Sequence, residues 1–126
     1  MKWDYEFLKP QNFLRVTTNG PFNLEDQIQM FDEIASLEQW QASMRILFDN
    51  RRLEMKDADF ETIIECVEVV ENFSHKHPGC RIAGLVNDGV NFGLGRQFEN
   101  ITSLSRETGF RLFKDEKMAV DWLFSN

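Results

Sequence analysis

The sequence predicts an α/β fold with a mixed sheet of about five strands and four helices. Apolar and polar residues alternate in two segments near the N-terminus, and short apolar runs then alternate with segments of helical spacing. Strands joined through helices run parallel, so an antiparallel hairpin should be followed by parallel strands. The length of 126 residues suits a single domain, residues 1–126.

The first half of the chain contains the hairpin, a helix and a third strand. We expect strands over 3–7 and 13–18, a helix over about 24–37 and a strand over 44–48. Asn23 is suited to cap the helix, in which Leu24, Ile28 and Phe31 recur at helical spacing. Asp49 should end the third strand, and a charged loop should follow it.

The second half repeats the pattern of helix and strand. We expect a helix ending near 76, a strand over 81–86, a helix over about 90–106, a strand over 110–113 and a last helix. Asp57 or Asp59 can cap the first of these helices, and Pro78 with Gly79 should end it. Asp115 should cap the last helix.

Composition excludes several broad functions. The net charge of −7 argues against binding to phosphate backbones or anionic lipid, because both need a dominant positive field. Two cysteines are too few for a disulfide framework, and no apolar run is long enough for a signal peptide or a membrane span. A cytoplasmic location follows by elimination. We expect no nucleic acid, membrane or cofactor among the partners.

No motif predicts catalysis or a metal site. His75, His77 and Cys80 lie close together, but their spacing is not one of the common zinc patterns. No serine or cysteine lies in a nucleophile elbow motif. We therefore expect no catalytic and no metal-binding residues.

A ligand site is predicted at the carboxyl ends of the parallel strands, where open α/β sheets bind ligands. The candidate residues follow the third and fourth strands and begin the next helix: Asn50, Arg51, Asn87, Asp88, Phe92 and Arg96. Two arginines and an aromatic wall would suit a small anion or a flat metabolite. The alternative is that these are ordinary turn and helix residues, because Asp and Asn favour such positions.

The second helix has a wider apolar arc than one packed face needs. Phe60, Ile63 and Ile64 belong to the expected inner stripe, which Cys66, Val69 and Phe73 extend. These last three side chains could form the interface of a homodimer or bind a regulatory protein. A neighbouring helix of the same chain could cover them equally well.

Two runs of residues resemble an uncharacterised branch of small bacterial proteins among the STAS, or SpoIIAA-like, domains, a group that includes anti-sigma-factor antagonists. The first run is V-x-F-G-x-x-R-x-F-E, formed by Val90, Phe92, Gly93, Arg96, Phe98 and Glu99. The second is F-x5-A-x-x-W-L, formed by Phe113, Ala119, Trp122 and Leu123. The resemblance implies a STAS-like fold and a non-enzymatic regulatory or protein-interaction module that forms homodimers. The alternative is a carrier or sensor of an apolar or anionic metabolite.

One position departs from the antagonist pattern. Antagonist-type STAS domains present a phosphorylatable serine after an aspartate at the start of the second helix. Asp57 and Ala58 occupy those positions here, and alanine has no hydroxyl group to modify. Thr62 lies about one helical turn further on, so we expect the phosphorylation switch to be absent.

Overall fold

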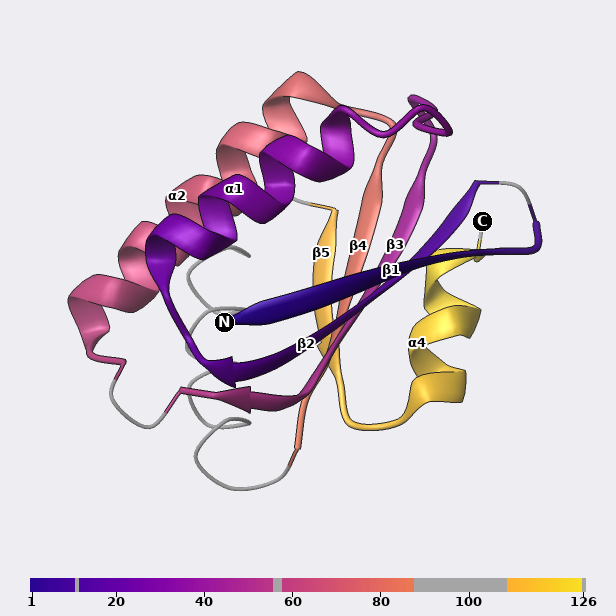
Figure 1. Ribbon diagram of the computed structural model, residues 1–126. Helices are drawn as coiled ribbons and strands as arrows, with labels where there is room; N and C mark the ends of the chain where they lie inside the picture. The colour runs from indigo at the N-terminus through magenta and orange to yellow at the C-terminus, as the bar shows by residue number, and fades with distance from the viewer. Residues whose placement is uncertain (11, 56–57, 88–108, 126) are drawn as a thin grey trace.

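The computed structural model describes residues 1–10, 12–55, 58–87 and 109–125, which form a sheet with helices on both faces (Figure 1). The elements are β1 (Lys2–Leu8), β2 (Phe13–Pro21), α1 (Leu24–Ala35), β3 (Arg45–Glu54), α2 (Phe60–Lys76), β4 (Arg81–Leu85), β5 (Phe110–Phe113) and α4 (Glu116–Leu123). The described residues thus contain three helices, whereas four were expected. The helix expected over about 90–106 lies outside them.

The sheet has the predicted mixed topology. Its strand order is β1-β2-β3-β4-β5, with β1 and β2 antiparallel and every later pair parallel. Because successive right-handed crossovers move along the sheet in one direction, their helices lie on the same face. Accordingly α1 and α2 lie side by side on one face, and α4 packs on the other (Figure 1).

All three described helices begin at a predicted cap. The carboxamide or carboxylate of Asn23, Asp59 and Asp115 accepts a hydrogen bond from the backbone N–H three residues later, at 2.9, 2.8 and 2.9 Å. Each bond satisfies one of the backbone donors that a helix leaves free at its N-terminus. Of the two caps proposed for α2, the structure has Asp59, and Asp57 lies outside the described residues.

A polar cluster ties the edge strand β1 to α1. The Tyr5 hydroxyl and the Trp3 indole N–H both donate to Glu33 Oε2, at 2.8 and 3.0 Å. These donors stabilise the carboxylate and hold the pKa of Glu33 below its ordinary value. Burial, with the nearby Glu33 carboxylate, raises the pKa of Tyr5. The cluster fixes α1 beside the strand.

The buried faces of α1 and α2 differ from the expected ones. In α1 the buried residues are Gln27, Met30, Phe31 and Ile34, while Ile28 is 43 % exposed. In α2 the buried residues are Ile63, Cys66, Val67, Val70 and Phe73, while Phe60 is 62 % exposed. The expected stripes were therefore right for Phe31 and Ile63 and wrong for Ile28 and Phe60, because several faces of these helices carry apolar residues at helical spacing.

Successive residues of β3 serve two hydrophobic cores, one on each face of the sheet. Ile46 and Phe48 belong to the core under α1 and α2, which also contains Phe31 and Phe73. Leu47 belongs to the core under α4. This alternation decides which side chains at the end of β3 can meet.

Candidate functional site

The strand β3 does not end at Asp49 but continues to Glu54. It pairs with β2 through an irregular stretch, in which β2 advances two residues from Thr17 to Asn19 while β3 advances three from Asp49 to Arg52. The extra residue in β3 is a β-bulge, and bulges change which side chains face each side of a sheet. Asn50 and Arg51 therefore lie within a strand, not in the loop that was expected.

The side chains of Asn50 and Arg51 lie on opposite faces of the sheet. The Asn50 side chain accepts a hydrogen bond of 2.6 Å from the buried Thr18 hydroxyl and lies on the face covered by α1 and α2. Arg51 donates through Nε and Nη2 to both carboxylate oxygens of Asp49, at 2.9 Å each, on the α4 face. This corrects the expectation that the two residues line one pocket, since adjacent strand residues point in opposite directions.

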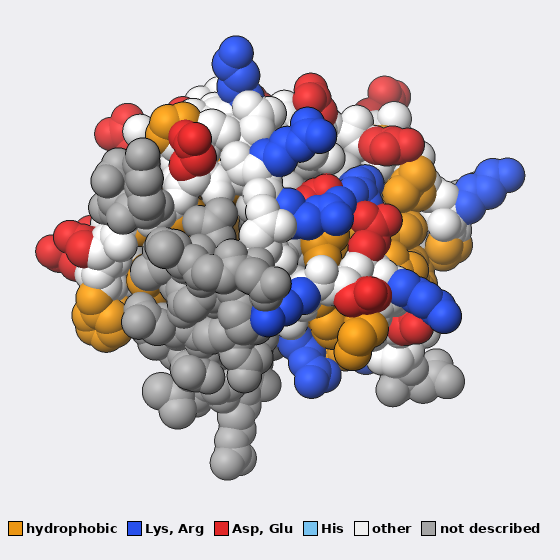
Figure 2. Space-filling model, turned by 90° about the horizontal axis from the view of Figure 1, so that it is seen from below, with side chains coloured by type: hydrophobic (Ala, Val, Ile, Leu, Met, Phe, Trp, Pro, Cys, Tyr) orange, Lys and Arg blue, Asp and Glu red, His pale blue; other side chains and the backbone are white. Residues whose placement is uncertain are grey.

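Two guanidinium groups on the α4 face, those of Arg15 and Arg51, are paired with carboxylates. Arg15 Nη2 lies 2.7 Å from Asp49 Oδ2, and Arg15 Nη1 lies 2.8 Å from Glu116 Oε1 at the start of α4. Hydrogen bonds from Arg51, with the charge of Arg15 in addition, hold the pKa of Asp49 below its ordinary value despite its burial. Basic and acidic side chains lie interspersed on this end of the molecule (Figure 2). These ion pairs link the sheet to α4, and Arg51 is already paired with Asp49.

The remaining predicted ligand residues follow β4. Asn87 is exposed, and its side-chain nitrogen donates to the backbone carbonyl oxygen of Arg51, which links the end of β4 to β3. Asp88, Phe92 and Arg96 lie outside the described residues. Of the six predicted ligand residues, the structure thus describes three, and only Asn50 lines a cavity.

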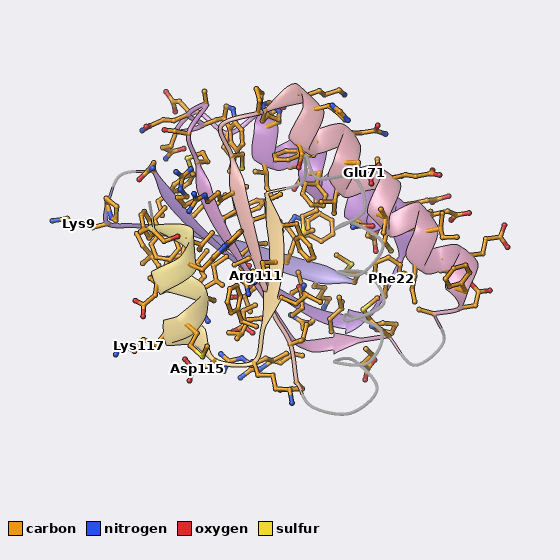
Figure 3. All side chains as sticks on the ribbon, turned by 180° about the vertical axis from the view of Figure 1, so that it is seen from behind. Lys9, Phe22, Glu71, Arg111, Asp115 and Lys117 are labelled. Atoms are coloured by element: carbon orange, nitrogen blue, oxygen red, sulfur yellow. The ribbon has the colours of Figure 1, made fainter. Side chains whose placement is uncertain are left out.

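A cavity of about 100 Å³ lies between the sheet and helices α1 and α2. Its described wall is mainly apolar and takes residues from α1, α2, β3, β4 and β5. Phe22, which directly follows β2, belongs to this wall, and Figure 3 shows it on the side of the sheet opposite Asp115 and Lys117. The bulge in β3 contributes to the wall, because it places Leu53 on the same face as Asn50.

Gln27 is the exceptional residue in this wall. It lies in the second turn of α1, is 8 % exposed and lines the cavity among phenylalanine and methionine side chains. Its side-chain oxygen Oε1 is fully buried and has no hydrogen-bond partner among the residues that the structure describes. The large majority of buried polar groups in proteins are hydrogen-bonded, so this atom needs an explanation.

Sequence reasoning missed Gln27, although the sequence contains a signal for it. Met30, Phe31 and Ile34 follow Gln27 at spacings of three, four and seven residues, which defines one face of a helix. A glutamine at the first position of such a stripe is a polar residue on an apolar face. The competing stripe through Leu24 and Ile28 concealed this pattern.

Two thiols are buried, and one of them lines the cavity. Cys66 in α2 is part of the wall, whereas Cys80, just before β4, is not among its described residues. Burial raises the pKa of each thiol to about 12, so both side chains are protonated at neutral pH. They differ in access to the cavity and not in ionisation.

The residues predicted to form an interface are partly covered by the chain itself. Cys66 and Phe73 are 3 % and 6 % exposed, and the Phe73 ring packs against the rings of Phe31 and Trp40, with centroids 4.9 and 5.6 Å apart. Val69 is half-buried. The expected face therefore needs correction, because intramolecular contacts cover two of its three side chains.

Neither a metal centre nor a membrane helix is found in the part of the chain that the structure describes. There, no group of three His, Cys, Asp or Glu side chains is placed to hold a metal ion. Among the same residues, no helix has the length and hydropathy that a membrane span requires.

Comparison with known proteins identifies the fold. The sequence matches no protein-family model and no curated protein. Its structure is similar to the crystal structure of an uncharacterized protein of the DUF3478 family with a SpoIIAA-like fold from Shewanella loihica PV-4. The two share 18 % sequence identity with a TM-score of 0.58, over 97 % of this chain and 92 % of that one. The likeness at this identity concerns the fold alone, and the chain therefore has the SpoIIAA-like fold that its sequence resembles.

Proposed function

We propose that the protein is a non-enzymatic STAS-like module that binds a small, largely apolar molecule between its sheet and helices α1 and α2. The cavity carries this proposal: its volume is about 100 Å³, and its described wall is mainly apolar. An apolar cavity of about 150 Å³ holds one benzene molecule, so a space of about 100 Å³ accepts a ligand no larger than about one ring unless the wall adjusts. Such a module would act as a carrier or sensor.

The wall favours an apolar ligand over an anion. Its described residues include Phe31, Phe48 and Met30, and no lysine, arginine or histidine. Arg51, one of the two arginines expected to bind an anion, is paired with Asp49 on the other face of the sheet. An anion in the cavity would therefore lose its hydration without gaining a cationic side chain from these residues.

A thermal-shift titration with toluene tests the proposal. A ligand at ten times its dissociation constant stabilises the folded state by about 1.4 kcal/mol. Unfolding entropy is about 2.1 cal/mol/K per residue, or about 0.26 kcal/mol/K for 126 residues, so Tm should rise by about 5 °C. An unchanged Tm up to the solubility limit of toluene and, in a second titration, of phenol would contradict the proposal.

The two cysteines provide a matched pair of variants. Cys66→Leu adds volume inside the cavity, whereas Cys80→Leu adds the same volume to a buried site outside its described wall. Overpacking should lower the stability of Cys80→Leu by about 1 to 3 kcal/mol, whereas the cavity gives the added volume of Cys66→Leu room. Only Cys66→Leu should weaken toluene binding, and equal binding by both variants would place the ligand elsewhere.

Thiol labelling of the unmodified chain gives a second measurement, which does not depend on the folding of a variant. Bound toluene should slow the reaction of Cys66 with methyl methanethiosulfonate more than that of Cys80. Peptide mass spectrometry would report the ratio of the two rates. An unchanged ratio at saturating toluene would show that the ligand does not contact the Cys66 side of the cavity.

Homodimer formation is a second candidate function, and exposed apolar side chains support it. Phe60 and Ile64, one turn apart on α2, are 62 % and 37 % exposed. If a second copy covers them, Phe60→Glu should halve the mass measured by light scattering without lowering Tm. A monomeric mass for the unmodified protein would contradict this candidate.

A further inference from the structure

We infer that the molecule bound in the cavity is neutral, about one ring in size, and donates a hydrogen bond to Gln27 Oε1. This inference rests on the proposed function and adds the chemical class of the ligand. It excludes both pure hydrocarbons and carboxylates as the preferred ligands. A ring that carries a hydroxyl or an N–H group belongs to the class.

The unpartnered oxygen of Gln27 is the observation that requires a donor. A buried acceptor without a partner costs about 1 to 3 kcal/mol of stability. Gln27 is more than nine-tenths buried and lines the cavity, and no described side chain or backbone N–H donates to Oε1. A ligand in the cavity that carries a donor can satisfy this atom, and a hydrocarbon cannot.

The rest of the wall selects the size and shape of the ligand. Phe22, Phe31, Phe48 and Phe110 contribute aromatic rings, which pack against a second ring face to edge or offset. Methionines at positions 1, 30 and 55 contribute flexible thioethers, which adapt to the outline of a ligand and contact aromatic rings favourably. These surroundings suit one flat ring better than a chain of polar groups.

The charges near the cavity select a neutral ligand. The α-amino group of Met1 is the cationic group on a described wall residue, and it is already paired with Asp26 Oδ2 at 3.1 Å. The other amide in the described wall is that of Asn50 in β3, whose side-chain oxygen accepts a hydrogen bond from the Thr18 hydroxyl. A carboxylate would face the Gln27 oxygen, and two acceptors repel each other.

Four probes of similar size separate these requirements: phenol, toluene, anisole and benzoate. Phenol offers a donor, toluene offers no polar group, anisole only accepts, and benzoate is charged. Titration of the ¹⁵N-labelled chain by NMR gives the four dissociation constants for the unmodified protein and for Gln27→Met. Methionine keeps the length and helix preference of the side chain but removes the acceptor.

The ratio of phenol affinity to toluene affinity is the quantity that tests the inference. One hydrogen bond should raise this ratio about tenfold in the unmodified protein relative to Gln27→Met. Both rings should shift the Gln27 side-chain NH₂ signals through their ring currents, and the hydrogen bond from phenol should make its shift the larger one. Anisole should follow toluene, and benzoate should bind at least tenfold more weakly than phenol.

The outcomes distinguish the inference from the proposed function. If toluene and phenol both bind and their ratio is the same in Gln27→Met, the cavity is a ligand site but the role of Gln27 is refuted. The same conclusion follows if anisole or benzoate is preferred to phenol. If none of the four probes binds, the proposed function itself fails. Removal of an unsatisfied acceptor should not lower stability, so Gln27→Met should have a Tm at least equal to that of the unmodified protein.

Discussion

Replacement of Asp49 by asparagine should strongly destabilise the folded protein, because it removes one buried, hydrogen-bonded carboxylate. The Asp49 side chain accepts hydrogen bonds from Arg15 Nη2 at 2.7 Å and from Arg51 Nε and Nη2 at 2.9 Å each. Asparagine keeps the shape but loses the charge, and its NH₂ group would face a guanidinium donor. The residue is only 8 % exposed, so water replaces little of what is lost.

The expected magnitude follows from the burial of each partner. A hydrogen bond between Arg15 and a charged acceptor is worth about 1.5 to 3 kcal/mol, and Arg15 keeps its second carboxylate, Glu116. Arg51 is 43 % exposed, and its pair with Asp49 adds at most about 1 kcal/mol after solvent screening. A total of about 1.5 to 4 kcal/mol corresponds to a fall in Tm of about 6 to 15 °C for 126 residues.

The pH dependence of the stability difference tests whether the charge of Asp49 is what stabilises the fold. The pKa of Asp49 is lowered in the folded state, so its stabilising contribution is complete above the unfolded pKa of about 3.9. This contribution is lost as the pH falls below the unfolded pKa and through the lower pKa that Asp49 has in the folded state. The difference in urea midpoint between the unmodified protein and Asp49→Asn should therefore shrink from about pH 7 to about pH 3.

Asp121→Asn is the matched control, because Asp121 is an exposed carboxylate on α4. This change should alter stability by less than about 0.5 kcal/mol at either pH. The reasoning would be refuted if Asp49→Asn behaved like this control at neutral pH. An equal loss at both pH values would refute the electrostatic explanation.

Three further predictions concern separate parts of the molecule. Phe73→Ala should lower stability by about 3 to 5 kcal/mol in thermal unfolding, because the ring fills an aromatic cluster within the chain, and the mass in light scattering should not change. A halved mass with little loss of Tm would instead indicate an intermolecular face. Tyr5→Phe should raise the pKa of Glu33 in an NMR titration, since it removes the strongest donor to that carboxylate, and an unchanged pKa would contradict the hydrogen bond. Mass spectrometry should find no phosphate on Ala58 or Thr62 in protein from its host, and a stoichiometric phosphate on Thr62 would contradict the loss of the switch.

Features set by local chemistry were predictable from the sequence. Asn23, Asp59 and Asp115 act as caps through bonds to residues three positions away, so their signals lie within one turn. The strand Phe110–Phe113 and the mixed sheet were likewise predicted, because their patterns depend on short runs and on the order of elements.

Features set by tertiary contacts were not predictable. The charged pair Arg51 and Arg52 is typical of a loop, yet β3 continues through it because β2 supplies backbone partners as far as Pro21. The orientation of α1 depends on which of two apolar stripes meets the sheet, and the stripe with Gln27 does so. The cavity depends on both of these features, so the sequence alone could not place it.

The claim that the cavity between the sheet and helices α1 and α2 is a ligand site is tested most directly by a crystal structure with bromobenzene. Data collected at the bromine absorption edge locate the bromine atom independently of the protein model. We expect an anomalous peak inside the cavity bounded by Phe31, Phe48 and Cys66. Peaks confined to the molecular surface, or no peak in crystals saturated with bromobenzene, would contradict the claim.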